Sequence, residues 1–213
     1  SPITNIRNHM QWNNKYIYPK STRSIVDGSR HYSVNEERLP SVTTILKATE
    51  SDEKKASLQA WKQRVGQKQA AIITREASSR GSSMHEYLEK FLLGKLNLDL
   101  LGDNTKERMM ADQIIENGLR GKLNEIWGCE ATLYYPGKYA GATDCVGVYE
   151  NKETIIDFKQ SNKPKKDEWI EDYYLQCAAY ALAHNTVHGS NITQAVILLC
   201  TKDNMFQRFL IDG

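Results

Sequence analysis

The sequence predicts a single α/β domain: a central mixed β-sheet flanked by helices. Three observations indicate this class. Helical patterns dominate residues 41–125, short β-rich segments follow in residues 126–161, and a helical segment with two more apolar strands closes the chain. At 213 residues and 40% hydrophobic content, the chain can form one substantial core but is too short for two full domains.

Residues 1–24 are polar and show no clear period, so we expect an N-terminal arm ahead of a domain spanning residues 25–213. Two interpretations of the arm stay open. An ordinary, loosely held surface extension is favoured, but Tyr16 and Tyr18 lie close to lysines and could instead stack on nucleic-acid bases. The dipeptide Asp27-Gly28 then predicts a small hairpin.

Several helices should follow the hairpin. Ser41 after Pro40 is expected to cap the first helix. Because the N-terminus of a helix presents free N–H groups to anions, Ser41 and Thr43 could also hold a DNA phosphate. Residues 52–79 are strongly helical with a break at Gly66, and residues 80–94 form the next helix. A long amphipathic helix should run from about residue 105 through 123, after a loop over residues 95–104 that packs down. These helices could arch over an active site.

A β-meander should form the catalytic part of the sheet, in residues 126–213 with the helix that follows it. Its strands are expected at residues 127–135, 139–149 and 154–161. Because side chains two apart in a strand share a face, Asp157 and Lys159 should point one way while Ile156 and Phe158 pack on the other. If the strand register places Asp144 across from Asp157, the result is a paired-acid pocket beside a lysine.

Paired carboxylates suit a hard divalent cation such as Mg²⁺ or Mn²⁺, one or two ions, and a neighbouring lysine can orient an attacking water. This arrangement indicates metal-assisted hydrolysis of a phosphodiester. Taken alone, an Asp and a Lys two apart are more often a solvated ion pair. Glu130, on the first strand of the meander, is either a further acid of the site or a partner of Lys159.

Four short motifs occur in order: Gly81 to His85, Gly141 to Asp144, Asp157-Phe158-Lys159 and Gln176 to Tyr180. Together they resemble the PD-(D/E)xK nuclease superfamily in its RecB-type branch. Within that branch the chain is similar to the family of mitochondrial genome maintenance exonucleases and their bacteriophage relatives, also through residues 39–46 and 61–64. The similarity spans roughly residues 25–185.

The resemblance implies a restriction-endonuclease-like core and a set of roles. His85 and the main-chain carbonyl of Phe158 join Asp144 and Asp157 as metal ligands, and Gln176 and Tyr180 hold the geometry of the site or touch the phosphate. The implied activity is a metal-dependent DNA exonuclease preferring single-stranded DNA with free ends. A flap endonuclease and a non-catalytic DNA-binding protein on the same fold are the alternatives.

Basic residues near the expected site are candidates for DNA binding. The loop that leaves the catalytic strand is lysine-rich, and a basic edge precedes it on the helices. With Ser41 and Thr43, the candidate DNA-binding residues are Lys62, Arg64, Arg80, Ser161, Lys163, Lys165 and Lys166.

Composition bounds the remaining properties. The net charge of +2 does not indicate nucleic acid by itself, so DNA binding needs a local basic patch. The four cysteines are scattered, which argues against a zinc module and, with the family comparison, against an iron–sulfur cluster. We expect a monomer without membrane contact, acting with replication or recombination proteins, in the cytoplasm of a bacterial host if phage-encoded; a mitochondrial matrix location is less favoured.

Overall fold

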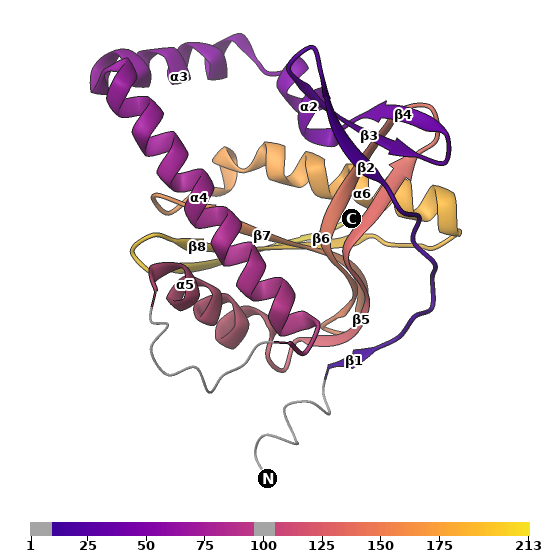
Figure 1. Ribbon diagram of the computed structural model, residues 1–213. Coiled ribbons are helices and arrows are strands. Elements are labelled where there is room, and N and C mark those ends of the chain that lie inside the picture. Colours follow the sequence, from indigo (N-terminus) through magenta and orange to yellow (C-terminus); the bar gives the residue numbers. More distant parts are fainter. Residues whose placement is uncertain (1–9, 96–104) are drawn as a thin grey trace.

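A computed structural model describes residues 10–95 and 105–213 (Figure 1). In this part of the chain, a mixed sheet of six strands has the order β1-β5-β6-β7-β8-β9, and a separate sheet of three strands has the order β2-β3-β4. The strands of the larger sheet are β1 (Gln11–Trp12), β5 (Leu123–Tyr135), β6 (Tyr139–Tyr149), β7 (Lys152–Ser161), β8 (Gln194–Thr201) and β9 (Phe206–Asp212). The smaller sheet comprises β2 (Thr22–Val26), β3 (Ser29–Val34) and β4 (Glu37–Pro40). The predicted fold class, a mixed sheet flanked by helices, is confirmed.

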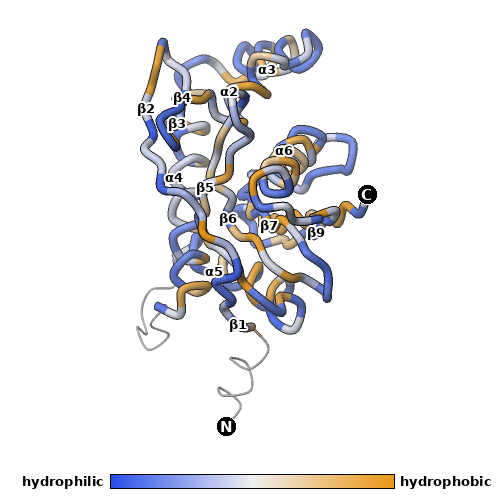
Figure 2. The backbone as a smooth tube through the Cα atoms, turned by 90° about the vertical axis from the view of Figure 1, so that its right-hand side faces the viewer, coloured by the Kyte–Doolittle hydropathy of each residue, from blue (hydrophilic) through white to orange (hydrophobic). Residues whose placement is uncertain are grey.

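Helices cover both faces of the larger sheet (Figure 2). They are α2 (Val42–Ala48), α3 (Asp52–Val65), α4 (Gln67–Leu92), α5 (Lys106–Ile114), the π-helical turn η1 (Ile115–Leu119), the 3₁₀ turn η2 (Asp167–Trp169) and α6 (Glu171–His188). One core cluster joins α4 and α5 to one face of the sheet, and a second joins α6 and α2 to the other. Alternation along β7 explains the division, because Ile156 and Phe158 lie in the first cluster and Ile155 in the second.

Strand pairing determines where the candidate site residues lie. β6 pairs with β7 in antiparallel register as far as Cys145 and Ile156, and the register places Asp144 and Asp157 next. Beyond that point β6 continues with β5, whereas β7 continues parallel to β8 as far as Ser161. The two strands therefore part at the candidate acids.

Several expected element boundaries differ from the structure. The helix that carries His85 is the second half of α4, which is continuous from Gln67 because nothing in its sequence breaks it near residue 80. The helix expected to run through residue 123 ends at Leu119, since Gly121 adopts a positive φ and Leu123 already belongs to β5.

The described part of the expected N-terminal arm packs against the domain, which corrects the expectation of a loosely held extension. Gln11 and Trp12 pair with β5, and the Trp12 indole donates a hydrogen bond to the Leu92 carbonyl, at 2.8 Å. The hydroxyl of Tyr18 lies 2.8 Å from Nε2 of the buried His184 on α6. Strand β2 spans the expected arm boundary at residues 24 and 25. Residues 1–9 and the expected loop at 96–104 lie outside the described residues.

Candidate active site

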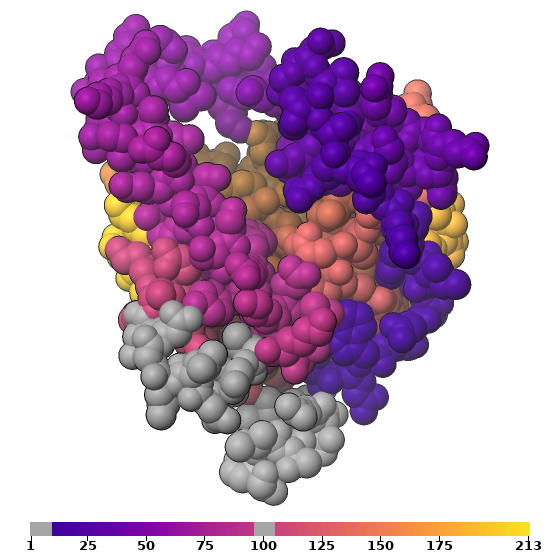
Figure 3. Space-filling view, viewed as in Figure 1, coloured from indigo at the N-terminus to yellow at the C-terminus, as the bar shows by residue number. Residues whose placement is uncertain are grey.

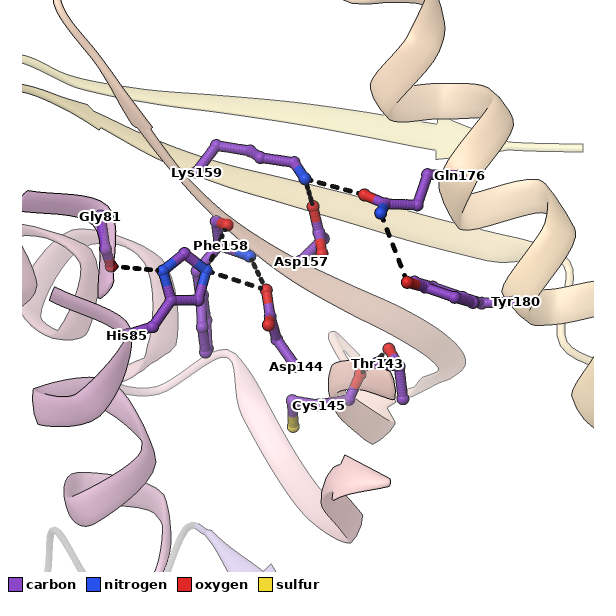
Figure 4. A network of polar contacts seen from close by, with 10 residues as sticks. All are labelled: Gly81, His85, Thr143, Asp144, Cys145, Asp157, Phe158, Lys159, Gln176 and Tyr180. Carbon is purple, nitrogen blue, oxygen red and sulfur yellow. Dashed lines mark hydrogen bonds and ion pairs between the residues drawn. The ribbon is translucent and has the colours of Figure 1, made fainter. Parts of the chain in front are cut away.

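The structure brings His85, Asp144, Asp157 and Lys159 together, along with Gln176 and Tyr180 (Figure 4). Asp144 comes from β6, Asp157 and Lys159 from β7, His85 from α4, and the last two from α6. Two strands and two helices on opposite faces of the sheet thus meet at one place. The predicted sharing of a face by Asp157 and Lys159, away from Ile156 and Phe158, is confirmed by the two core clusters.

The two carboxyl groups have pKa values shifted in opposite directions. Burial opposes ionisation of Asp144, but the positive charge and hydrogen bond of His85 lower its pKa to about 2. Burial and the charge of Asp144 raise the pKa of Asp157 to about 7, although Lys159 acts to lower it. Asp144 is therefore the first of the pair to ionise, because two adjacent buried carboxylates repel each other.

His85 is held between hydrogen-bond acceptors on both sides. Its Nδ1 lies 2.7 Å from the Gly81 carbonyl, and its Nε2 lies 2.8 Å from the Phe158 carbonyl and 3.3 Å from Asp144 Oδ2. Burial lowers the pKa of His85, but Asp144 and the carbonyl of Gly81 outweigh it and raise it to about 9. Since both ring nitrogens must donate, His85 is an imidazolium here, and it would have to release the proton on Nε2 to act as a metal ligand.

The ammonium group of Lys159 is fixed by its neighbours. It lies 2.9 Å from Asp157 Oδ2 and donates a hydrogen bond of 2.8 Å to Gln176 Oε1. Gln176 in turn donates to the Tyr180 hydroxyl, at 3.3 Å. Burial lowers the pKa of Lys159, but Asp157 and Asp144 raise it above its ordinary value, so the group stays charged. Gln176 and Tyr180 therefore orient the lysine within the site.

A metal ion fits part of this donor set. Among the described residues, no group of three or more His, Cys, Asp or Glu side chains is arranged to hold one. Asp157 Oδ2 is buried with the Lys159 ammonium beside it, at 2.9 Å, and Asp144 Oδ2 accepts the backbone N–H of Phe158, at 2.8 Å, besides its contact with His85. Two carboxylates and a carbonyl suit Mg²⁺, which keeps several waters and needs few protein ligands.

Glu130 lies beside this site, on β5. It stands opposite Asp144 between the registered pairs Cys129–Cys145 and Ala131–Thr143, with a positive φ of 49°. Although the residue is exposed, burial of its carboxyl group and the charges of Asp144 and Glu89 raise its pKa to about 7. Of the two roles left open, further acid or partner of Lys159, the first agrees with this position because its electrostatic partners are Asp144 and Glu89.

Gly141 permits one of the close contacts of the site. A Cβ atom at this position would lie 2.7 Å from the Tyr180 ring, too close for any real contact. The glycine of the second motif therefore lets α6 approach β6. The glycine of the first motif differs, since a Cβ on Gly81 would meet only Gln160, at an ordinary 3.6 Å.

The candidate DNA-binding residues do not all lie together. A basic pocket of about 610 Å³ beyond Lys159 is lined by Trp61, Arg64, Ile73, Gln160, Ser161, Asn162, Lys163, Lys165, Tyr173 and Lys202. Four candidates, Arg64, Ser161, Lys163 and Lys165, thus come together there. Arg80 borders them through hydrogen bonds to Gln160 and Asn162, at 2.9 and 2.8 Å.

The other candidates lie elsewhere. Lys62 lines a second pocket between α3 and α4, and the ammonium of Lys166 lies over the Trp169 ring. Ser41 is buried and its hydroxyl accepts from the Thr44 N–H at 3.0 Å, so it is the helix cap, and direct phosphate binding by its side chain is not supported; Thr43 is exposed. Sequence reasoning missed Lys202, which the turn between β8 and β9 brings beside Ser161.

The molecular surface is hollowed on the face seen in Figure 3. In this view α3 and α4 border the hollow on one side and the β2–β4 sheet on the other, while α2 and α3 join the two sides (Figure 1). The expected arch is thus formed by α3 and the first half of α4, not by the helices nearest His85. None of the 14 residues of α3 is buried, and the side chain of its Lys54 pairs with Asp172 of α6.

Comparison with known proteins identifies relatives of this chain. Over 178 residues, 78% of the chain, it is 32% identical to mitochondrial genome maintenance exonuclease 1 of Xenopus tropicalis, 31% to that of Mus musculus and 29% to that of Homo sapiens. The chain spans about half the length of these curated relatives, 49–50%. No family model matches. The crystal structure of SSO0001 aligns with a TM-score of 0.33 at 16% identity, covering 64% of this chain and 63% of that one, which is too weak to carry an argument.

Proposed function

Because this chain is a relative of the mitochondrial genome maintenance exonucleases, as its four motifs predicted, we propose that it is a metal-dependent DNA exonuclease preferring single-stranded DNA with free ends. The observation that carries the proposal is the meeting of Asp144, Asp157 and Lys159 where β6 and β7 part. The names of the relatives support nuclease activity on their own; metal dependence and strand preference rest on the site and the hollow.

Each residue has a proposed role in phosphodiester hydrolysis. Asp144, Asp157 and the Phe158 carbonyl would hold Mg²⁺ or Mn²⁺, which when bound lowers the pKa of water and offsets charge on the phosphate. Lys159, kept charged and oriented by Gln176, positions the attacking water and stabilises the developing negative charge. His85 fixes the Phe158 carbonyl, as it does here, and after losing its Nε2 proton it could serve as a further ligand.

Selectivity for single strands follows from the approach to the site. A flexible strand can pass between α3 and the β2–β4 sheet, whereas a stiff duplex has less freedom to bend through the same opening. Arg64, Lys163 and Lys165 in the basic pocket would then contact phosphates of the strand. Glu130 is a further candidate acid. Four residues that do not line the basic pocket also stay proposed DNA contacts: Thr43, Lys62, Arg80 and Lys166.

The testing experiment compares end-labelled linear, circular single-stranded and duplex DNA with Mg²⁺ and with EDTA. We expect loss of the linear single strand, survival of the circle and no cleavage with EDTA. Asp157→Ala and Lys159→Ala should lower the rate by more than about a thousandfold with DNA binding retained. Lys152→Ala is the matched control, because Lys152 starts the same strand and pairs only with the exposed Asp212 among the described residues.

Each other outcome has a definite meaning. Cleavage of the circle would replace the exonuclease with an endonuclease using the same site. Full turnover of both the Asp157 and Lys159 variants would remove the proposed mechanism. If wild-type protein binds the DNA without cleaving it, a non-catalytic DNA-binding role is favoured. The expected cytoplasmic location and phage source stay predictions; in the described residues, none of the helices combines the length and apolar character that crossing a bilayer requires.

A further inference from the structure

Tyr173 lies on the face of α6 that looks into the candidate site. It precedes Gln176 by three residues and Tyr180 by seven, so all three project from one side of the helix. Its side chain is half-buried, and the ammonium of Lys159 lies over its ring, 4.9 Å from the centroid. None of the four motifs includes Tyr173, although its ring meets the central lysine of the site.

The ring completes the surroundings of the Lys159 ammonium. Asp157 Oδ2 and Gln176 Oε1 lie on other sides of the same nitrogen, at 2.9 and 2.8 Å. An aromatic face attracts a cation through its quadrupole, more strongly where water is excluded. With an acid, an amide and a ring around it, the ammonium has few alternative orientations, and the ring is the contact that a leucine of similar size would not reproduce.

The same tyrosine is also a wall of the basic pocket. Trp61, Arg64, Lys163 and Lys202 line the same pocket. Aromatic side chains with several cations form the combination that binds an unpaired base together with its phosphate. The pocket volume of about 610 Å³ lies in the range of small-molecule sites and can admit a nucleotide.

We propose that Tyr173 is a positioning residue for Lys159, and that the basic pocket behind it is a subsite for one unpaired nucleotide of the DNA strand. A nucleotide in this subsite touches the same ring that orients Lys159. A nucleotide bound in the pocket therefore affects the position of Lys159 in the active site. The inference rests on the proposed nuclease function for its kinetic consequences, but the contact between ring and ammonium exists without it.

The first measurement concerns the contact itself and requires no activity. In metal-free protein with ¹³C-labelled, chemically unmodified lysines, the Lys159 ε-methylene signal, assigned with Lys159→Arg, should be shifted upfield by the ring. Tyr173→Phe should keep the shift and Tyr173→Leu should abolish it. Tyr174→Leu, one residue along α6, is the control and should leave the signal in place. A Lys159 signal that is the same in wild type and Tyr173→Leu overturns the contact.

The second measurement separates positioning from binding, in single-stranded DNA degradation with Mg²⁺. Tyr173→Leu should lower kcat about tenfold or more, and Tyr173→Phe should restore it to near wild type. Lys202→Ala, which alters the pocket but not Lys159, should raise KM severalfold with kcat unchanged. Equal impairment by Phe and Leu would overturn the role of the ring, and an unchanged KM in Lys202→Ala would overturn the subsite.

The two experiments fail in distinguishable ways. If wild-type protein does not degrade DNA, the proposed function fails, while the NMR result still decides the contact. In that case quenching of a 2-aminopurine-labelled single strand decides the subsite, since stacking in the pocket should quench it and Trp61→Leu should relieve the quenching. Absence of quenching in wild-type protein that binds the strand overturns the subsite.

Discussion

Single residues of the site act through their neighbours. The pKa of Asp144 is lowered because His85 stands beside it, and the pKa of Asp157 is raised by burial and by the charge of Asp144. Lys159 is charged although it is largely buried, since the acids on β6 and β7 outweigh burial. The identity of each side chain therefore sets its chemistry only together with the groups around it.

The two motif glycines should respond in opposite ways to alanine. Gly141→Ala places a methyl group against the Tyr180 ring, which must move, so we expect a stability loss of about 1–3 kcal/mol and a lower kcat. Gly81→Ala meets only ordinary contact inside α4 and should stabilise the protein by up to about 1 kcal/mol.

Denaturant unfolding and DNA degradation check both variants. Similar stability changes in the two would show that the Tyr180 contact does not constrain Gly141. The double variant Gly141→Ala/Tyr180→Leu relieves the overlap and should recover part of the stability without recovering activity.

At the scale of elements, α3 is the least supported helix of the arch. Its N-terminus is capped by Ser51, whose hydroxyl accepts from the Lys54 N–H, but no residue of the helix is buried. By contrast, α6 buries five residues, among them Gln176 and Tyr180. Helical hydrogen bonds without buried apolar contacts open easily, so the arch can move while the catalytic frame stays in place.

Hydrogen exchange should show this difference directly. We expect amides of α3 to exchange at least about a hundredfold faster than those of α6, because only the latter have buried support. Binding of single-stranded DNA should slow exchange in α3. Equal protection of α3 and α6 in free protein would contradict the expectation, and Lys54→Ala, which removes the ion pair with Asp172, should raise exchange further in α3 alone.

The whole molecule should respond to pH through the buried site. Asp157 and Glu130, with pKa values raised from 3.8 and 4.5 to about 7, bind protons in the folded state that the unfolded chain has released. The stability that these two groups contribute is therefore present below about pH 4 and is lost as the pH rises to about 7. His85, raised from 6.5 to about 9, contributes stability below pH 6.5 that is lost as the pH rises through 9.

We therefore expect the Tm of metal-free protein to fall from about pH 6.5 to pH 9. Two groups act oppositely at lower pH: burial lowers the pKa of His184 from 6.5 to about 4, and the pKa of Asp144 is lowered from 3.8 to about 2, so both contributions are lost at acid pH. Saturating Mg²⁺ should reduce the decline, since a cation offsets the charges of Asp144 and Asp157. Thermal unfolding across this range checks the prediction; Asp157→Asn should flatten the lower part, and a Tm rising with pH would contradict it.

Much of the local structure follows from the sequence alone. The Asp27-Gly28 hairpin, the Ser41 cap and the common face of Asp157 and Lys159 follow from turn chemistry, capping and the period of two. The order of the four motifs also predicted the relatives that the comparisons found. These features depend on residues close together in the chain, where a short pattern contains the whole physical cause.

Only the tertiary structure decided which distant groups meet. The parting of β6 from β7 places Asp144 and Asp157 side by side, α6 brings Tyr173 over Lys159, and the β8–β9 turn brings Lys202 to the basic pocket. The N-terminal arm packs on α6 through Tyr18 for the same reason. Such contacts depend on strand register, helix rotation and packing across the whole core, and these are set by all the elements together instead of by residue spacing within any one of them.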